Sequence, residues 1–171
     1  MQLQYETWSQ ICDNLNKSGK IIQKSKLGLQ GNHMSDGTIK PLFSLLYSRI
    51  LRVVALNLIE NCIGPLGAID IARALKSNCH LKHLFLKFNK LGSKGAKYIS
   101  RSLYYNNALK ILDIGRNNIR DDGAKAIAHM LTHNKSLIEI DMSFNCIFEE
   151  SSPQIAQALK KNTTLLKLGT H

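Results

Sequence analysis

Apolar residues recur along the chain in a pattern whose period changes within each stretch of 28 residues. Leu84 and Leu86 flank a single residue, and this alternation is typical of a short strand with one buried face. Farther along, Ile99 and Leu103 lie four apart with the small Ser100 between them, which is the spacing of a helix packed closely on a sheet. The pattern predicts a strand, a turn and a helix in each stretch.

This unit is repeated, and its copies align. Asn61, Asn89, Asn117 and Asn145 follow one another at intervals of 28 residues, each in the turn after a predicted strand. The copies begin at Val53, Leu81, Leu109 and Leu137, with a shortened copy at Leu27 and the start of another at Leu165. Because one unit cannot bury all of its apolar side chains, the copies are expected to stack and share a continuous core. The sequence therefore predicts an α/β solenoid with parallel strands over residues 24–171.

The two ends of the array differ from its middle. Apolar residues before the first copy follow helical spacing: Tyr5, Trp8, Ile11, Cys12 and Leu15. Residues 1–23 are therefore expected to form an N-terminal capping helix and a lead-in, with Trp8 in the core beneath the helix. At the other end the last strand shows no cap in the sequence. The chain is expected to be a monomer, or a dimer through this uncapped C-terminal edge.

A buried ladder explains the repeated asparagines, because their amides can satisfy turn backbone groups that would otherwise lack partners. The predicted ladder comprises Asn32, which is one residue out of step, Asn61, Asn89, Asn117 and Asn145. A second set lies where each helix should end and predicts left-handed caps: Asn78, Asn106, Asn134 and Asn162. At the helix starts, Ser93 and Asp121 are the predicted N-caps.

The repeated motif is L-x-x-L-x-L-x-x-N-x-L followed by G-x-x-x-I-a-x-x-L, over about residues 27–168. It resembles the ribonuclease-inhibitor-type leucine-rich repeat. The resemblance implies a curved, horseshoe-shaped segment with a parallel sheet on the concave face, helices on the convex face, and a protein-binding task. Members include ribonuclease inhibitor, innate immune receptors, the Ran GTPase-activating protein and tropomodulin, so it implies no single partner. Ribonuclease inhibitor alternates Asn with Cys at the turn position, whereas every copy here has Asn.

Composition and charge indicate the compartment and the kinds of site to expect. The 171 residues include 23 Lys and Arg against 12 Asp and Glu, which gives a net charge of +11. No apolar run reaches the roughly 18 residues that cross a bilayer, and the opening MQLQYETWSQ does not resemble a cleaved signal peptide. The four cysteines lack C-x-x-C spacing, which indicates reduced thiols rather than a zinc site or a disulfide framework. We expect a cytoplasmic protein without a metal or another cofactor.

The concave face is the predicted partner-binding surface, because residues between the inward leucines project from it. Its aromatic anchors lie among charges of both signs, as in a protein interface with a central hot spot. The predicted site residues are His83, Phe85, Lys87, Phe88, Asp113, Arg116, Glu139, Asp141 and Phe144. The alternative is that one or more of the phenylalanines packs against a neighbouring turn.

Catalytic arrangements are scarce. His129 and His133 lie four apart on a predicted helix but lack the acidic residue of an H-E-x-x-H zinc motif, so we interpret them as surface histidines. Asp113 and Asp141 occupy one column in adjacent strands, roughly 5 Å apart at the backbone. On an open sheet this pair is suited to binding a partner's cation rather than to acid–base catalysis.

The predicted outer face of the helices is basic. Its outward positions include Arg73, Lys76, Lys94, Lys97, Arg101, Lys125, Lys160 and Lys161. A solvated face is the ordinary meaning of such charges, and an anionic membrane surface is a minor alternative. The scarcity of Arg and of interleaved aromatic residues argues against nucleic acid.

The sequence thus favours a non-enzymatic module that binds a protein of unknown identity through its concave face. A first alternative is a regulator or inhibitor of a nuclease or a GTPase, including an effector that an intracellular bacterium delivers into the host cytoplasm. A second alternative is charge-driven binding to an anionic membrane or nucleic acid.

Overall fold

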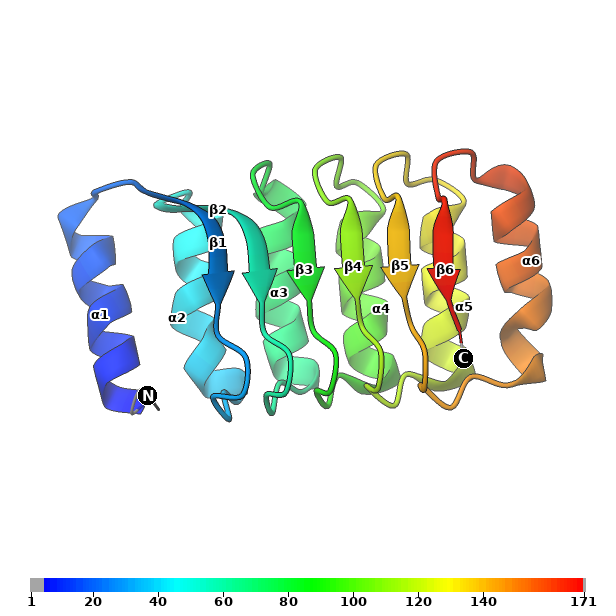
Figure 1. The fold of residues 1–171 in the computed structure, drawn as a ribbon, viewed down its shortest axis with the longest axis horizontal. Helices are drawn as coiled ribbons and strands as arrows, with labels where there is room; N and C mark the ends of the chain where they lie inside the picture. The colour runs from blue at the N-terminus through cyan, green and yellow to red at the C-terminus, as the bar shows by residue number, and fades with distance from the viewer. Residues whose placement is uncertain (1–4, 171) are drawn as a thin grey trace.

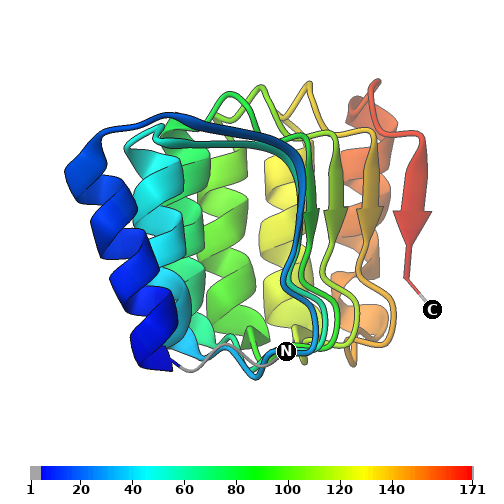
Figure 2. The same ribbon diagram turned by 60° about the vertical axis from the view of Figure 1, so that its left-hand side comes forward.

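Strands and helices alternate along the chain and form two layers (Figures 1 and 2). The computed structural model describes the backbone of residues 5–170, and the side chains of residue 10 and residues 12–170. The elements are α1 (Tyr5–Ser18), β1 (Ile22–Gly28), α2 (Asp36–Tyr47), β2 (Leu51–Asn57), α3 (Pro65–Ser77), β3 (His83–Phe85), α4 (Gly92–Leu103), β4 (Ile111–Asp113), α5 (Arg120–Leu131), β5 (Glu139–Asp141), the short 3₁₀ helix η1 (Glu149–Ser151), α6 (Ser152–Lys161) and β6 (Lys167–Gly169).

The six strands form one parallel sheet in the order β1-β2-β3-β4-β5-β6. Each strand pairs with the next strand in the sequence, and the helices between them cover one face of the sheet (Figure 1). The register places equivalent positions of successive repeats side by side, so that Phe85 pairs with Asp113 and Asp113 with Asp141. The predicted α/β solenoid is confirmed.

The core lies between the two layers. Leu84, Leu112 and Ile140 from the strands are at most 1% exposed, and Ile99 and Ile127 from the helices at most 2%. Burying each such side chain contributes about 2 kcal/mol relative to leaving it in water. Because the same positions recur in each repeat, the core continues from one repeat to the next.

Recurring glycines let the helices approach closely. A Cβ added at Gly95 would lie 3.1 Å from the Cβ of Ala68, and one added at Gly123 would lie 3.1 Å from the Cβ of Ala96. Both distances are tighter than an ordinary van der Waals contact, so these positions leave no room for a side chain. Ser151 takes the equivalent position in the last repeat, where it is fully buried and its hydroxyl donates to Asp121 at 2.7 Å.

The two predicted N-caps have other roles. The residues at the N-cap positions of α4 and α5 are Leu91 and Ile119, so the prediction for Ser93 and Asp121 was wrong. The hydroxyl of Ser93 donates to the carbonyl of Ile119, and Asp121 accepts from the backbone N–H of Ser151 at 3.0 Å. Both side chains satisfy backbone groups of the following repeat. The sequence of one repeat does not indicate these contacts, because the partner groups lie in the next repeat.

The asparagines after the strands bridge successive repeats. The amide of Asn117 donates to the carbonyls of Leu86 in the preceding repeat (2.8 Å) and Gly115 in its own turn (2.9 Å). Its oxygen accepts from the N–H of Leu91 at 3.3 Å. Asn32 differs, because it is only partly buried and its amide donates to Gln30 in its own turn at 3.0 Å.

The asparagines after the helices form a second ladder. The amide of Asn106 donates to the carbonyl of Leu75 at 2.6 Å, and its oxygen accepts from the N–H of Leu109 at 2.8 Å. The prediction of left-handed caps was wrong, because Asn78 and Asn162 have extended backbone with φ near −80°. Their side chains bridge repeats, which an extended backbone permits.

At the N-terminal end, α1 runs beside α2 (Figure 2). Cys12 of α1 is fully buried, and this burial, together with the nearby charge of Asp13, raises the pKa of its thiol to about 11. The predicted place of Trp8 lies outside the described side chains. The first strand begins at Ile22, within the stretch predicted as a lead-in.

Candidate functional site

The side chains that follow the strands form a row along one edge of the sheet, which we call the turn column. Its members are Glu60, Phe88, Arg116 and Phe144, each directly before a ladder asparagine. All have φ between 52 and 57°. This left-handed conformation costs about 1 kcal/mol for a residue with a side chain, and Gly31 adopts it in the first repeat. The later repeats thus carry large side chains at a position where glycine would be less strained.

Three members of the turn column stack on one another, and we call them the aromatic stack. The guanidinium carbon of Arg116 lies 5.0 Å from the ring centroid of Phe88 and 4.3 Å from that of Phe144. The ammonium of Lys87 lies 5.7 Å from the ring of Phe88. Phe88 is 42% exposed and Phe144 is 59% exposed. These two rings therefore face solvent, held by a cation between them, rather than packing against a neighbouring turn.

Two carboxylates lie in the neighbouring strand column, with opposite shifts of pKa. Burial is the main cause that raises the pKa of Asp113, and the charge of Asp141 adds to it. Burial also acts to raise the pKa of Asp141, but hydrogen bonds from the hydroxyl and N–H of Ser143, with the charges of Lys87 and Lys167, lower it overall. Asp141 therefore offers a stable negative charge beside the aromatic stack.

These shifts predict that Asp113→Asn raises the stability of the fold at about pH 7. Folding raises the pKa of Asp113, so ionisation opposes folding above the folded-state pKa, and this penalty disappears as the pH falls below 3.8. The neutral amide lacks the penalty and can still accept the hydrogen bond from the N–H of Gly115. Urea unfolding at about pH 7 and about pH 3 measures the change.

Asp141→Asn is the matched control, and its effect on stability is expected to have the opposite sign. The lowered pKa of Asp141 means that its charge stabilises the fold above 3.8, and that this contribution is lost as the pH falls through the folded-state pKa. This variant is therefore expected to lose stability at about pH 7 and to approach the unsubstituted protein in acid. Two changes of the same sign at about pH 7 would contradict the assignment.

The remaining predicted site residues lie on the same face. His83 and Phe85 pack edge to face with their ring centroids 6.5 Å apart, and both are half-buried. Glu139 forms an ion pair with Lys167 of the next strand at 2.6 Å. The structure thus brings Lys87, both aspartates and the aromatic stack together. His83, Phe85 and Glu139 lie beside them on the same face. The sequence prediction missed Lys167, although it lies 28 residues after Glu139 in the same column.

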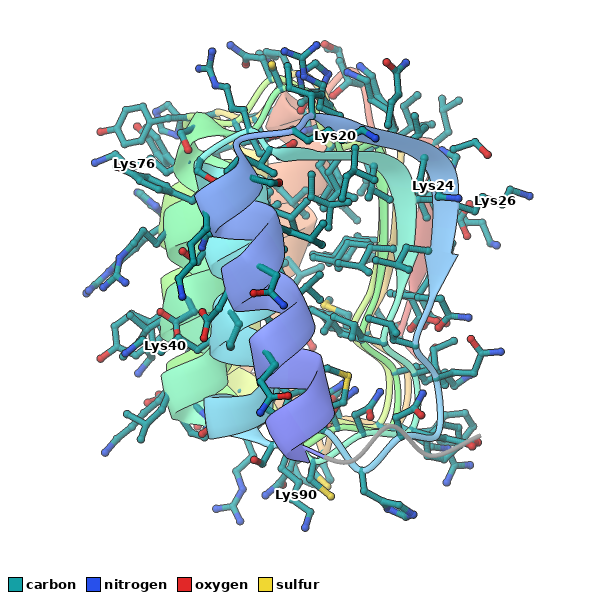
Figure 3. The ribbon with its side chains drawn as sticks, turned by 90° about the vertical axis from the view of Figure 1, so that its left-hand side faces the viewer. Lys20, Lys24, Lys26, Lys40, Lys76 and Lys90 are labelled. Atoms are coloured by element: carbon teal, nitrogen blue, oxygen red, sulfur yellow. The ribbon has the colours of Figure 1, made fainter. Side chains whose placement is uncertain are left out.

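Basic side chains lie on both faces of the molecule. Figure 3 shows Lys24 and Lys26 projecting from β1 on the sheet side, and Lys40 and Lys76 on the helix side. Some outward cations are paired, since Lys97 meets Asp122 at 2.7 Å and Lys125 meets Glu150.

His129 of α5 and His133, in the turn after that helix, belong to an aromatic cluster on the helix side. The ring centroid of Tyr104 lies 4.4 Å from that of His133 and 5.7 Å from that of His129. Within the part of the chain that the structure describes, no three His, Cys, Asp or Glu side chains gather as a metal ion would need. Over the same residues, no helix is long and apolar enough to cross a membrane.

Comparison with known proteins finds leucine-rich repeats in two segments of the chain and similar folds among solved structures. A family model described as Leucine Rich repeat matches residues 77–100 and 105–128. The solved structure titled Leiomodin-1 Actin-Binding Site 2 superposes with a TM-score of 0.68 and 26% identity, covering 75% of this chain and 76% of that one. The C-terminal domain of Caenorhabditis elegans tropomodulin superposes with a TM-score of 0.62 and 13% identity, covering 90% of this chain and 92% of that one. No curated protein sequence matches the chain.

Proposed function

Because the chain is a leucine-rich-repeat protein of the ribonuclease-inhibitor-like type, we propose that it is a non-enzymatic module that binds a partner protein through its aromatic stack. The observation that carries the proposal is the exposure of two phenylalanine rings, Phe88 and Phe144, on either side of Arg116. Aromatic residues and arginine are the residue types that contribute most to binding at protein interfaces.

The stack is prepared for binding before a partner arrives. Its three residues occupy equivalent positions of successive repeats, and their backbones are fixed by bonds between repeats, such as that from the N–H of Arg116 to the carbonyl of Ser143 at 2.9 Å. A rigid anchor loses little conformational entropy on binding.

Charges beside the stack favour a partner of mixed polarity. Lys87 and Arg116 are cationic, whereas Asp141 keeps a lowered pKa and a negative charge. Asp113 and Asp141 also accept hydrogen bonds from Gly115 and Ser143, so they are held as fixed acceptors on an open face. Such a surface suits recognition of a partner's apolar group flanked by charged side chains.

Actin is the first partner to test. The leiomodin-1 segment whose title calls it an actin-binding site shares 26% identity with this chain over about three quarters of both. Three alternatives rest on the resemblance or on net charge alone: regulation of a nuclease or GTPase, effector delivery, and polyanion binding. Among the described residues on the face of the aromatic stack, none indicates one of these functions.

Photo-crosslinking with purified actin tests the proposal. A benzoyl-phenylalanine placed at Phe144 is expected to crosslink to actin, because the ring faces solvent in the centre of the proposed interface. The matched control places the same group at Leu66 of α3, which is 68% exposed on the helix side, and is expected to remain uncrosslinked. Binding of actin without a crosslink at position 144 would contradict the proposed binding surface. The absence of any binding would contradict actin as the partner.

A further inference from the structure

A groove on the opposite side of the molecule forms a second candidate surface. It runs over α3, α4 and α5, away from the sheet, and has a volume of about 1090 Å³. Apolar residues contribute much of its lining: Ile69, Ala72, Ala126, Met130, Tyr98 and Tyr104. The groove thus offers an apolar surface between helices, as grooves that accept a partner helix do.

The walls of this groove carry more positive than negative charge. Five cations line it, against one acid, Asp122; the cations are Arg73, Lys76, Lys97, Arg101 and Lys125. Arg73 bonds to Asp70 at 3.2 Å, and Lys97 and Lys125 pair with Asp122 and Glu150. Lys76 and Arg101 are exposed, and neither has an ion-pair partner among the described residues. Two positive charges therefore remain available to a ligand.

A buried hydroxyl also lines the groove. Ser100 is 3% exposed, and its hydroxyl has no hydrogen-bond partner among the described residues. A buried polar group without a partner costs free energy, and this oxygen has almost no accessible surface, so Ser100 describes the wall of the groove rather than a contact offered to a ligand. Ser100 and Arg101 both line the groove from α4.

We propose that this groove binds an acidic amphipathic helix of a partner protein. The apolar side chains of that helix would cover Ile69, Ala72 and Tyr98, and its carboxylates would meet Lys76 and Arg101. The lining of α3 begins at Ile69, beyond the first turn of that helix, and the first turn of α5 contributes only Asp122, whose carboxylate would repel a phosphate. Phosphate sites favour the free backbone N–H groups at helix N-termini, so the groove suits carboxylates on an apolar scaffold better than a phosphate-bearing polymer.

A synthetic peptide tests the inference. The probe is a fluorescein-labelled peptide of about 18 residues, with Leu at i, i+4 and i+7 spacing, Glu at the positions that flank this stripe, and Ala and Gln elsewhere to favour a helix. Its binding is followed by fluorescence anisotropy. The double charge reversal Lys76→Glu with Arg101→Glu is expected to weaken binding about 30-fold, because two attractions become repulsions. Both side chains are exposed, so the variant is expected to keep the fold.

The matched control is Lys40→Glu with Lys94→Glu, which changes the net charge equally at exposed helix positions outside the groove. It is expected to weaken binding less than about 3-fold. An equal loss in both doubles, or equal binding of a peptide with Lys in place of Glu, would overturn the inference. So would tighter groove-dependent binding of single-stranded DNA or phosphatidylserine vesicles. Phe144→Ala is expected to leave peptide binding unchanged, which separates this groove from the aromatic stack.

Discussion

Asn117→Ala is expected to lower the free energy of unfolding by about 3 kcal/mol, because it removes the inter-repeat and turn hydrogen bonds of a buried side chain. Asn117 is 1% exposed. Without its side chain, the N–H of Leu91 loses its acceptor, whereas the carbonyls of Leu86 and Gly115 each lose one donor and keep another, from the amide of Asn89 and the N–H of Phe88. An unsatisfied buried group costs about 1–3 kcal/mol and each further lost hydrogen bond about 1 kcal/mol, which together give the expected loss.

Equilibrium unfolding in urea measures this loss. The matched control is Asn107→Ala, which removes the same side chain from an exposed turn position and is expected to change stability by less than about 0.5 kcal/mol. Asn117→Asp keeps the shape but turns a carboxylate toward the carbonyls of Leu86 and Gly115, so its loss is expected to be at least as large. A loss below about 1 kcal/mol in Asn117→Ala would show that the ladder is not a main source of stability.

The strand positions and the ladder after the strands could be predicted because they recur. A column of equivalent residues 28 apart fixes both the period and the register, so Phe85, Asp113 and Asp141 could be placed side by side before the structure was known. The same reasoning located Phe88, Arg116 and Phe144 in one column. Recurrence therefore gives the location of a residue whenever every repeat uses it in the same way.

The contacts of individual side chains could not be predicted in this way. Ser93 and Asp121 looked like N-caps within their own repeat, but each bonds to backbone groups 26–30 residues away. The left-handed backbone of Arg116 likewise arises from a turn held by the next repeat, and arginine gives no local signal for it. Such features depend on how two copies pack, which the pattern of one copy does not contain.

The charge distribution was also only partly predictable. The helical spacing placed Lys76 and Arg101 on the outer face, and the structure adds that Lys97 and Lys125 are already paired there. The set of outward Lys and Arg residues thus overstates the number of free cations that a partner would meet on the helices. Charge alone could not distinguish a solvated face from a groove, because the groove depends on how α3, α4 and α5 pack.

If the aromatic stack binds a partner protein, the double variant Phe88→Ala with Phe144→Ala should show the second large effect. Both rings are exposed, so their removal should leave the fold intact, and alanine can keep the left-handed backbone at the same cost as phenylalanine. Losing two central aromatic anchors is expected to cost about 2.7 kcal/mol of binding free energy, or about 100-fold in affinity.

The decisive measurement is the dissociation constant for actin, determined by titration calorimetry with the unsubstituted protein, the double variant and a control double. The control, Leu66→Ala with Tyr47→Ala, removes side chains of α3 and α2 that are 68% and 53% exposed and lie outside both proposed surfaces. We predict about 100-fold weaker binding for Phe88→Ala with Phe144→Ala and a change of less than about 3-fold for the control. Full affinity in the double variant, or an equal loss in the control, would contradict this prediction.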